Sequence, residues 1–239
     1  MNLELNQKSI SSAALSILDV IKTINPDNPM QYVIDIVKPY AIEKLNEKIS
    51  LCSRCPISNN KHRSYVSGNI ESDLLIICDY INSANDTENY IHTPLEDETS
   101  YVTFSEALDL IDDVDINSFA YCNIVNCVPC NIGCDSTRLP TKKELYTCSE
   151  HIVKEVIEIM RPKMLLVLGN TPLRAFSDYN FSAVRGQMVD ILNIPTMVTY
   201  APSYFEKMSS IKDAATLAEE YQNFLKDLNL AFQYLKDIK

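Results

Sequence analysis

The sequence is short of several residue types and patterns, and each shortage excludes a class of protein. No run of about 18 uncharged apolar residues occurs among its 239 residues, so we expect no membrane span. The N-terminal segment lacks the basic stretch and continuous apolar core of a signal peptide, so a cytoplasmic protein is expected. Tryptophan is absent, glycine occurs four times, and Asn, Ile and Lys are frequent, which is compatible with a phage or a low-GC host. For a phage protein, the compartment would be the cytoplasm of the host.

Positive charge is also scarce. The chain has 21 Lys and Arg against 32 Asp and Glu, which gives a formal net charge of -11. A protein that lives mainly on DNA usually carries the opposite sign, and this field slows the approach to a polyanion. The charge therefore disfavours a free-standing, high-affinity DNA-binding protein and favours attachment to a protein partner, while local basic patches could still contact DNA.

Apolar periodicity predicts helices at both ends of the chain and an alternating core between them. The expected helices are 8–24, 29–49, 104–114, 140–160, 170–177 and 213–238, with Pro39 kinking or splitting the second. The expected strands are 73–78, 118–125, 163–169 and 195–200. Strands that are apolar along their length and alternate with helices predict an α/β fold. We expect a three-layer α/β/α arrangement with a central, mainly parallel four-stranded sheet, plus extra N- and C-terminal helices.

Ligands in such sheets bind at the carboxyl ends of the strands. Here those ends are Asp79-Tyr80, the segment Asn123–Cys127, Gly169–Thr171 and Thr199–Ser203. Thr171 is predicted to cap the helix that follows the third strand, with Pro172 in its first turn. The last segment, within “TYAPSYF”, has an alanine at the position where a functional loop would carry an acid or a base.

Eight cysteines in a reducing compartment favour metal or cluster ligation, or plain burial, over disulfides. The pair Cys52-x2-Cys55 has the spacing of a ligand hairpin for zinc or an iron–sulfur cluster, and Cys127 and Cys148 could complete four thiolates. The dense array “CNIVNCVPCNIGC” could instead hold a metal without the distant pair. Scattered core cysteines are the simpler alternative. Cys78 and Cys122 are expected to pack in strands.

Several segments occur in the order and at about the separations of one known family. They are “CSRCP”, “DLLIIC”, “CNIVNC”, “CSEHIVKEVIEIMRPKMLLVLGNTPLRAF”, “VRG” and “PTMVTYAPSYF”. On these segments the chain resembles the iron–sulfur uracil-DNA glycosylases, family 4 of that superfamily. The resemblance implies a glycosylase-like domain at 50–208, a helical extension at 1–49, and a C-terminal helix at 209–239 that packs on the same domain.

The resemblance also implies a cofactor. The family's four ligands correspond to Cys52, Cys55, Cys127 and Cys148, which would hold a [4Fe–4S] cluster, with zinc as the alternative. The interval from Cys127 to Cys148 is longer than is usual in the family, so Cys130 or Cys134 could replace Cys127. Such a cluster need not do redox work, because its ligation energy couples directly to folding.

The catalytic motifs depart from the family. Where a “GEAPG”-like loop helps to position water, this chain has “CDYIN”, in which Asp79 keeps a carboxylate and Tyr80 narrows the approach to the ligand. Asn123 corresponds to the asparagine that reads the pyrimidine edge, and Leu95 stands where a phenylalanine stacks under the base. Ala201 stands where a histidine stabilises the oxyanion. Losing one such donor costs about 10²–10³ in rate, so the resemblance implies a severely impaired reaction.

DNA contacts are implied for six residues at the same edge. Tyr204 and Phe205 follow Pro202, where the family inserts a wedge into the duplex. The phosphate contacts would come from Asn170, Thr171, Arg185 and Ser203. Surface aromatic residues, a capped helix and a solvated arginine are the simpler alternatives. His92 and His151 are the remaining candidates to replace the missing imidazole, and His151 is more simply structural.

Three hypotheses for function follow from the sequence. The first is a catalytically impaired, glycosylase-like iron–sulfur protein that binds DNA, a protein, or both, within replication, repair or transcription machinery. The second is an active DNA glycosylase with a divergent pocket that uses Asp79 and Asn123 on uracil or a modified base. The third is a protein that binds a nucleotide or another small molecule in the same pocket.

Overall fold

The computed structural model describes residues 29–59, 63–80, 95, 98–111, 114–130 and 137–238. The chain divides into two compact units after Glu43, and helix α2 (Pro29–Ser50) runs across this boundary. Pro39 lies inside α2, which is a single helix, so the expected split at that residue does not occur. A proline removes one N–H donor, and the other backbone bonds of the helix can carry it through. The helix expected at 8–24 lies outside the described residues.

The second unit is built on one six-stranded sheet with the order β1-β3-β2-β4-β6-β5. The strands are β1 (Ser67–Gly68), β2 (Leu74–Tyr80), β3 (Ala120–Val125), β4 (Met164–Leu168), β5 (Met188–Ile191) and β6 (Ile194–Thr199). The central strands β3, β2, β4 and β6 pair in parallel, while β1 and β5 are antiparallel edges. The predicted α/β fold is confirmed, and the sheet has six strands rather than four. The edges escaped prediction because β1 has two residues and β5 is largely exposed.

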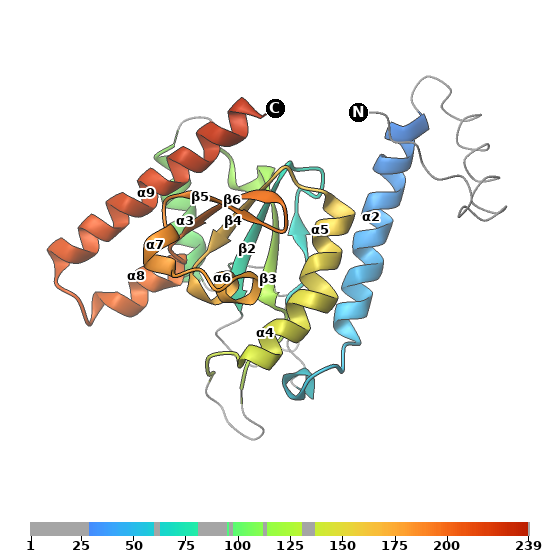
Figure 1. Ribbon diagram of the computed structural model, residues 1–239, viewed down its shortest axis with the longest axis horizontal. Helices are drawn as coiled ribbons and strands as arrows, with labels where there is room; N and C mark the ends of the chain where they lie inside the picture. The colour runs from blue at the N-terminus through green and yellow to red at the C-terminus, as the bar shows by residue number, and fades with distance from the viewer. Residues whose placement is uncertain are drawn as a thin grey trace. The chain divides into compact units, whose positions relative to one another are not determined.

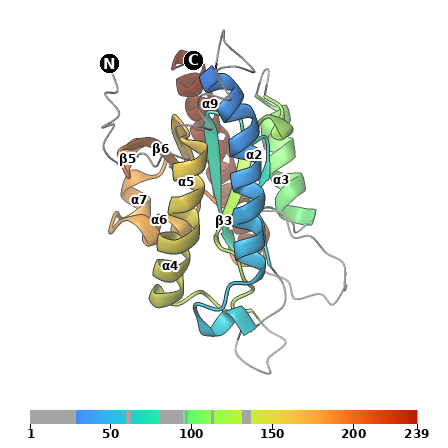
Figure 2. The same cartoon turned by 90° about the vertical axis from the view of Figure 1, so that its right-hand side faces the viewer.

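Helices cover both faces of this sheet (Figures 1 and 2). They are α3 (Glu98–Asp109), α4 (Lys142–Cys148), α5 (Lys154–Met160), α6 (Asn170–Phe176), α7 (Phe181–Val184), α8 (Pro202–Ser209) and α9 (Ala214–Asp237). In both views α3 lies on one side of the sheet and α4 and α5 lie on the other. None of the described helices is both long enough and apolar enough to cross a membrane.

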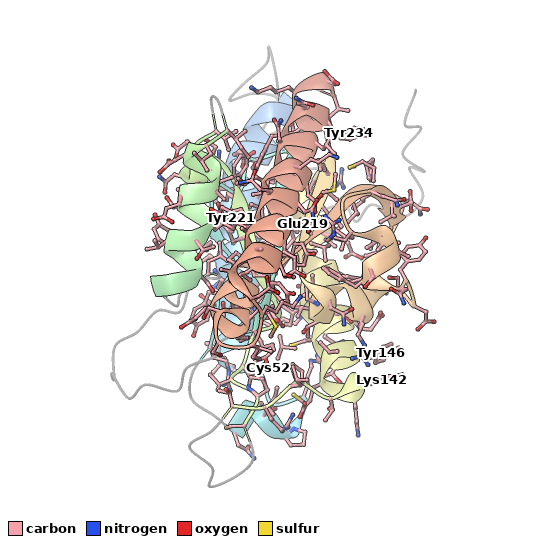
Figure 3. All side chains as sticks on the ribbon, turned by 90° about the vertical axis from the view of Figure 1, so that its left-hand side faces the viewer. Cys52, Lys142, Tyr146, Glu219, Tyr221 and Tyr234 are labelled. Carbon is pink, nitrogen blue, oxygen red and sulfur yellow. The ribbon has the colours of Figure 1, made fainter. Side chains whose placement is uncertain are left out.

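The core on the α3 side joins the sheet to α8 and α9. Phe104 of α3 and Phe224 of α9 are fully buried, with ring centroids 6.5 Å apart, and Phe205 of α8 lies 5.3 Å from Phe224. They pack on one face of the strands, through residues such as Ile76 and Leu166. Figure 3 shows side chains filling the space between α9 and α3, where Tyr221 is labelled. The last helix is therefore part of the same hydrophobic core as the sheet.

The long helix predicted at 140–160 is interrupted. Thr141 caps α4 through a capping box, in which its hydroxyl accepts from the Glu144 amide at 3.3 Å and the Glu144 carboxylate accepts from the Thr141 amide at 2.7 Å. A π-helical turn, Ser149–Val153, then separates α4 from α5. Such turns insert an extra residue into a helix and change which side chains face the core. Here the turn begins directly after Cys148.

Replacing Phe224 with alanine tests whether α9 is an integral part of the core. Phe224→Ala removes a fully buried ring and should lower the free energy of unfolding by about 3–5 kcal/mol. Leu230→Ala, on the same helix but 41% exposed, is the matched control and should change it by about 0.5 kcal/mol or less. Urea unfolding of the three proteins gives the comparison, and equal losses for both variants would contradict the packing described.

Candidate functional site

The carboxyl ends of the four parallel strands meet at one edge of the sheet. Cys78 of β2 is in register with Asn123 of β3, and Leu168 of β4 is in register with Thr199 of β6. Asp79 therefore lies one residue beyond the level of Asn123. Because side chains alternate along a strand, Asn123 and Asp79 point to opposite faces and flank this edge. We call this set of strand ends the carboxyl edge.

Asp79 is the most perturbed carboxyl group of the carboxyl edge. The residue is half-buried, but its Oδ1 atom is shielded from solvent and has no hydrogen-bond partner among the described residues. Burial raises the pKa of Asp79 from 3.8 to about 6, against the opposing effects of the Thr171 hydroxyl and the positive charge of Lys207. A buried oxygen without a partner is costly, and it can accept a hydrogen bond from a ligand or a water molecule.

Asn123 of β3 and Leu95 are the other two predicted pocket residues whose surroundings the structure describes. Asn123 is 4% exposed and brings a buried side-chain amide to this edge. Its amide can therefore both donate to and accept from a ligand. Leu95 has a left-handed backbone, with φ of 68°, and packs against the core on the α3 side. Tyr80 ends β2 and is half-buried.

Ala201 is the residue before α8 and touches the end of β4. A Cβ atom built on Gly169 would lie 3.0 Å from the Ala201 Cβ, and Gly169 itself has a φ of +102°. Glycine is required at this position, because both the backbone conformation and the close approach exclude a side chain. The exits of β4 and β6 are thus in direct contact. Gly169 also precedes α6 without a side-chain cap, so the prediction that Thr171 caps this helix is wrong.

The two predicted wedge residues are both engaged within the protein. Phe205 is 8% exposed and belongs to the core. The Tyr204 ring stacks on Tyr200 at 5.0 Å. The Tyr204 hydroxyl donates to the Glu220 carboxylate at 3.0 Å and accepts from the Lys212 ammonium at 2.7 Å. To insert between two bases, a wedge side chain has to project away from the protein surface. The contacts above instead hold both rings against the protein.

The four predicted phosphate contacts are placed differently from one another. Asn170 is exposed, and Thr171 and Ser203 are half-buried. The Arg185 guanidinium lies 5.3 Å from the centre of the Tyr200 ring and pairs with a buried carboxylate, Asp227 of α9. Sequence reasoning missed Asp227. The sequence does indicate it, because an aspartate within the apolar stripe of the helix “NFLKDLNLAF” is expected to be buried and paired.

The four predicted cysteine ligands come from three separate segments. Cys52 and Cys55 follow α2 and are half-buried, whereas Cys127, which follows β3, and Cys148, at the end of α4, are buried. Burial raises the pKa of Cys127 to about 12 and that of Cys148 to about 11. Each of these two thiols senses the charges of Cys52 and Cys55, and the positive charge of Arg63 lowers the pKa of both. The four thiols are therefore within electrostatic range of one another.

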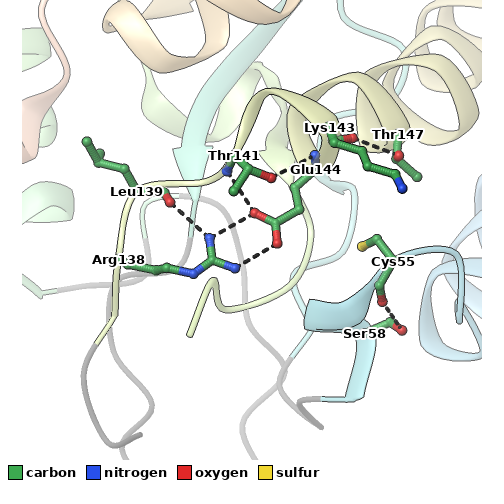
Figure 4. A network of polar contacts seen from close by, with 8 residues as sticks. All are labelled: Cys55, Ser58, Arg138, Leu139, Thr141, Lys143, Glu144 and Thr147. Carbon is green, nitrogen blue, oxygen red and sulfur yellow. Dashed lines mark hydrogen bonds and ion pairs between the residues drawn. The ribbon is translucent and has the colours of Figure 1, made fainter. Parts of the chain in front are cut away.

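Hydrogen bonds connect the segments that carry these thiols. Arg63 forms an antiparallel bridge with Cys127, and its guanidinium donates to the Ser58 carbonyl in the turn after Cys55. The Asn126 amide donates to the Ser64 carbonyl at 3.0 Å. Figure 4 shows Cys55 beside the start of α4, where Arg138 is paired with Glu144 at 2.7 Å. Among the described residues, no three His, Cys, Asp or Glu side chains are grouped closely enough to hold a single metal ion.

The other candidates for these roles are placed as follows. Cys130 is half-buried and bridges to Thr137, and Cys134 lies outside the described residues. Cys78 and Cys122 are buried in β2 and β3. His151 is exposed on the π-helical turn, and His92 is not among the described residues.

Two comparisons with known proteins found similar sequences. A family model described as the uracil DNA glycosylase superfamily matches residues 85–229, which is more than half of the chain. The chain is also 27% identical over 171 residues to the Type-4 uracil-DNA glycosylase of Thermotoga maritima, a match that covers 68% of this chain and 82% of that protein. The stretch matched by the family model contains Asn123, Ala201 and Asp227, and it begins after Asp79.

The raised pKa of Asp79 predicts a specific dependence of stability on pH. Between about pH 4 and pH 6 the folded chain keeps a proton on Asp79 that the unfolded chain has already released. The free energy of unfolding therefore falls as the pH rises through this window. Asp79→Asn should therefore raise the free energy of unfolding by about 2 kcal/mol at neutral pH and have little effect near pH 4. Denaturation at both pH values measures the difference. The exposed Asp178→Asn is the control for loss of charge, and a gain that does not depend on pH would contradict the assignment.

Proposed function

Because the chain belongs to the uracil-DNA glycosylase superfamily, we propose that it binds an unpaired pyrimidine of DNA at the carboxyl edge and excises it poorly or not at all. The observation that carries the proposal is the composition of this edge. The buried Asn123 amide and the Asp79 carboxylate remain there, and the Oδ1 atom of Asp79 has no partner among the described residues, while the exit of β6 carries Ala201. In this proposal the recognition groups are kept, and position 201 at the exit of β6 lacks a side chain that could stabilise the departing base.

The proposed roles follow from the chemistry of each side chain. The Asn123 amide can both donate to and accept from the Watson–Crick edge of a pyrimidine. The Asp79 carboxylate, largely ionised at neutral pH with a pKa of about 6, can accept a hydrogen bond from water through Oδ1. Excision also needs a donor for the negative charge on the leaving base. The Ala201 methyl group cannot donate a hydrogen bond, and losing one such donor costs about 10²–10³ in rate.

An active glycosylase remains the second candidate, and one observation favours it. The Asp79 Oδ1 atom is buried without a partner among the described residues, which is the state expected of a carboxylate that positions a water molecule. Activity would then depend on Asp79 and on another source of charge stabilisation. The assay described below separates the two candidates.

We also propose that Cys52, Cys55, Cys127 and Cys148 hold a [4Fe–4S] cluster. Four thiols within electrostatic range and a nearby cation, Arg63, support a site for an anionic cluster ligated by thiolates. Zinc, which four thiolates bind in a tetrahedral site, is the alternative occupant for the same cysteines. When bound, the cluster would supply ligation energy that pins the three cysteine segments to the sheet.

The net charge of -11 supports a role alongside a protein partner rather than as an independent DNA-binding protein. We infer that such a partner, in replication, repair or transcription machinery, brings the carboxyl edge to DNA in the cytoplasm. In this proposal the glycosylase-like domain, residues 50–208, supplies the pocket and the cysteine site. The helical extension at 1–49 and the C-terminal helix at 209–239 are then available to contact the partner.

Restoring an imidazole at position 201 tests the proposed function. Wild-type protein is incubated with uracil-containing single- and double-stranded oligonucleotides, and abasic sites are then cleaved with alkali. We expect near-background cleavage by the wild type and a rise of about 10²-fold in Ala201→His, because the imidazole restores the missing donor. Ala201→Leu controls for bulk, and Asp79→Ala in the histidine variant should abolish the gain. Efficient wild-type cleavage that is lost in Asp79→Ala would instead establish the active glycosylase.

The cofactor assignment predicts the metal content of the purified protein. Protein prepared without oxygen should be brown and contain about four irons per chain, and Cys127→Ser should lose most of them. Cys130→Ser is the matched control, since Cys130 lies three residues away and bridges to Thr137. If the iron content is kept in Cys127→Ser but lost in Cys130→Ser, the third ligand is Cys130 and not Cys127. A colourless protein with stoichiometric zinc would show that the four cysteines hold zinc and not a cluster.

A further inference from the structure

Asp227 is a buried acidic residue that none of the roles above uses. It lies on α9, and its side chain is 4% exposed. Burial raises the pKa of its carboxyl group, while Thr199 and Arg185 act in the opposite direction. A buried ion pair is weak evidence for stability, because apolar residues of similar volume often serve a fold as well or better. Its presence here therefore suggests a role in fixing geometry.

One carboxylate holds two segments of the chain. The Arg185 Nη1 atom lies 2.7 Å from Oδ2 and 3.0 Å from Oδ1 of Asp227, and the Thr199 hydroxyl donates to Oδ2 at 2.8 Å. A Cβ atom on Gly186 would lie 2.4 Å from Oδ1, and its backbone has a φ of +72°. The “RG” pair is thus explained, because the arginine supplies the ion pair and the glycine permits the close approach.

Backbone hydrogen bonds extend this arrangement to the carboxyl edge. The Gly186 amide donates to the Val198 carbonyl at 2.8 Å, and the Gly169 amide donates to the Thr199 carbonyl at 2.8 Å. Gly169 touches Ala201 and directly precedes α6, the helix that carries Thr171. The Thr171 hydroxyl is one of the groups that set the pKa of Asp79. A continuous series of contacts therefore runs from Asp227 of α9 through the end of β6 to Gly169, directly before α6.

We propose that Asp227 is a positioning residue for the proposed pyrimidine pocket: by holding Arg185 and Thr199 with one carboxylate, it fixes the exits of β6 and β4. The inference rests on the proposed function for its ligand, and on the contacts above for its geometry. Arg185 is then a part of the scaffold whose guanidinium stays over the Tyr200 ring. The C-terminal helix, through Asp227, sets the shape of the pocket as well as closing the core.

The Asp227→Asn variant tests this role, because asparagine keeps the size of the side chain and removes its charge. Hydrogen exchange is measured at the amides of Gly169 and Gly186. Affinity is measured for a single-stranded oligonucleotide with one non-cleavable 2′-fluoro-deoxyuridine among adenines and for the same oligonucleotide with adenine throughout. We expect about tenfold faster exchange at both amides and about tenfold loss of the preference for the pyrimidine, at a temperature where the variant remains folded.

Two further variants make the outcome specific. Thr199→Val removes only the hydroxyl donor and should reproduce part of both effects. Asp73→Asn breaks a 3.1 Å ion pair with Lys163 at the opposite end of β2 and should alter neither measurement.

Each remaining outcome decides between the claims. A lower melting temperature of Asp227→Asn, with unchanged exchange at Gly169 and unchanged preference, would make Asp227 a structural residue only and overturn the inference. A wild type with no preference for the pyrimidine would overturn the proposed function, while the exchange at Gly169 and Gly186 would still judge the role of Asp227.

Discussion

The parallel register of β3, β2, β4 and β6 is the constraint on which the rest of the structure depends. It places the exits of four strands, separated by more than a hundred residues in the sequence, at one edge of a buried sheet. Asn123 and Asp79 flank that edge, and Gly169 and Ala201 meet on it. The core between the sheet and α3, α8 and α9 keeps this register fixed, because a slip of one residue would turn every side chain to the other face.

The carboxylates of Asp227 and Asp79 illustrate how the same fold treats charge in different ways. Asp227 is held by Arg185 and Thr199, so its burial is compensated and fixes the surrounding backbone. The Oδ1 atom of Asp79 has no partner among the described residues, so the burial of this oxygen is uncompensated, and the pKa of Asp79 rises to about 6 despite Thr171 and Lys207. Uncompensated burial is expected where a ligand completes the hydrogen bonding. In our proposal, Asp227 is the positioning group and Asp79 is the group whose hydrogen bonding a ligand completes.

The sequence predicted what depends on apolar patterning and missed what depends on tertiary contacts. Four apolar runs identified the four central strands, whereas β1 and β5 carry no such run. Thr171 looked like a helix cap, but the residue before α6 is Gly169, which lies close to Ala201 and provides no side-chain cap. Phe205 resembled a wedge, and only the structure shows that it packs on Phe224. The spacing of the cysteines indicated a site, but no sequence pattern could show that Cys127 and Cys148 share an electrostatic environment.

The central claim is that the carboxyl edge still recognises a pyrimidine although Ala201 has replaced the group that would help to excise it. Calorimetric titration with a uracil-containing, non-cleavable single strand, compared between the wild type and Asn123→Ala, tests this claim most directly. The account predicts that the wild type binds this strand more tightly than an all-adenine strand and that Asn123→Ala binds both alike. Equal affinities in the wild type, or a preference that survives the loss of the Asn123 amide, would contradict it.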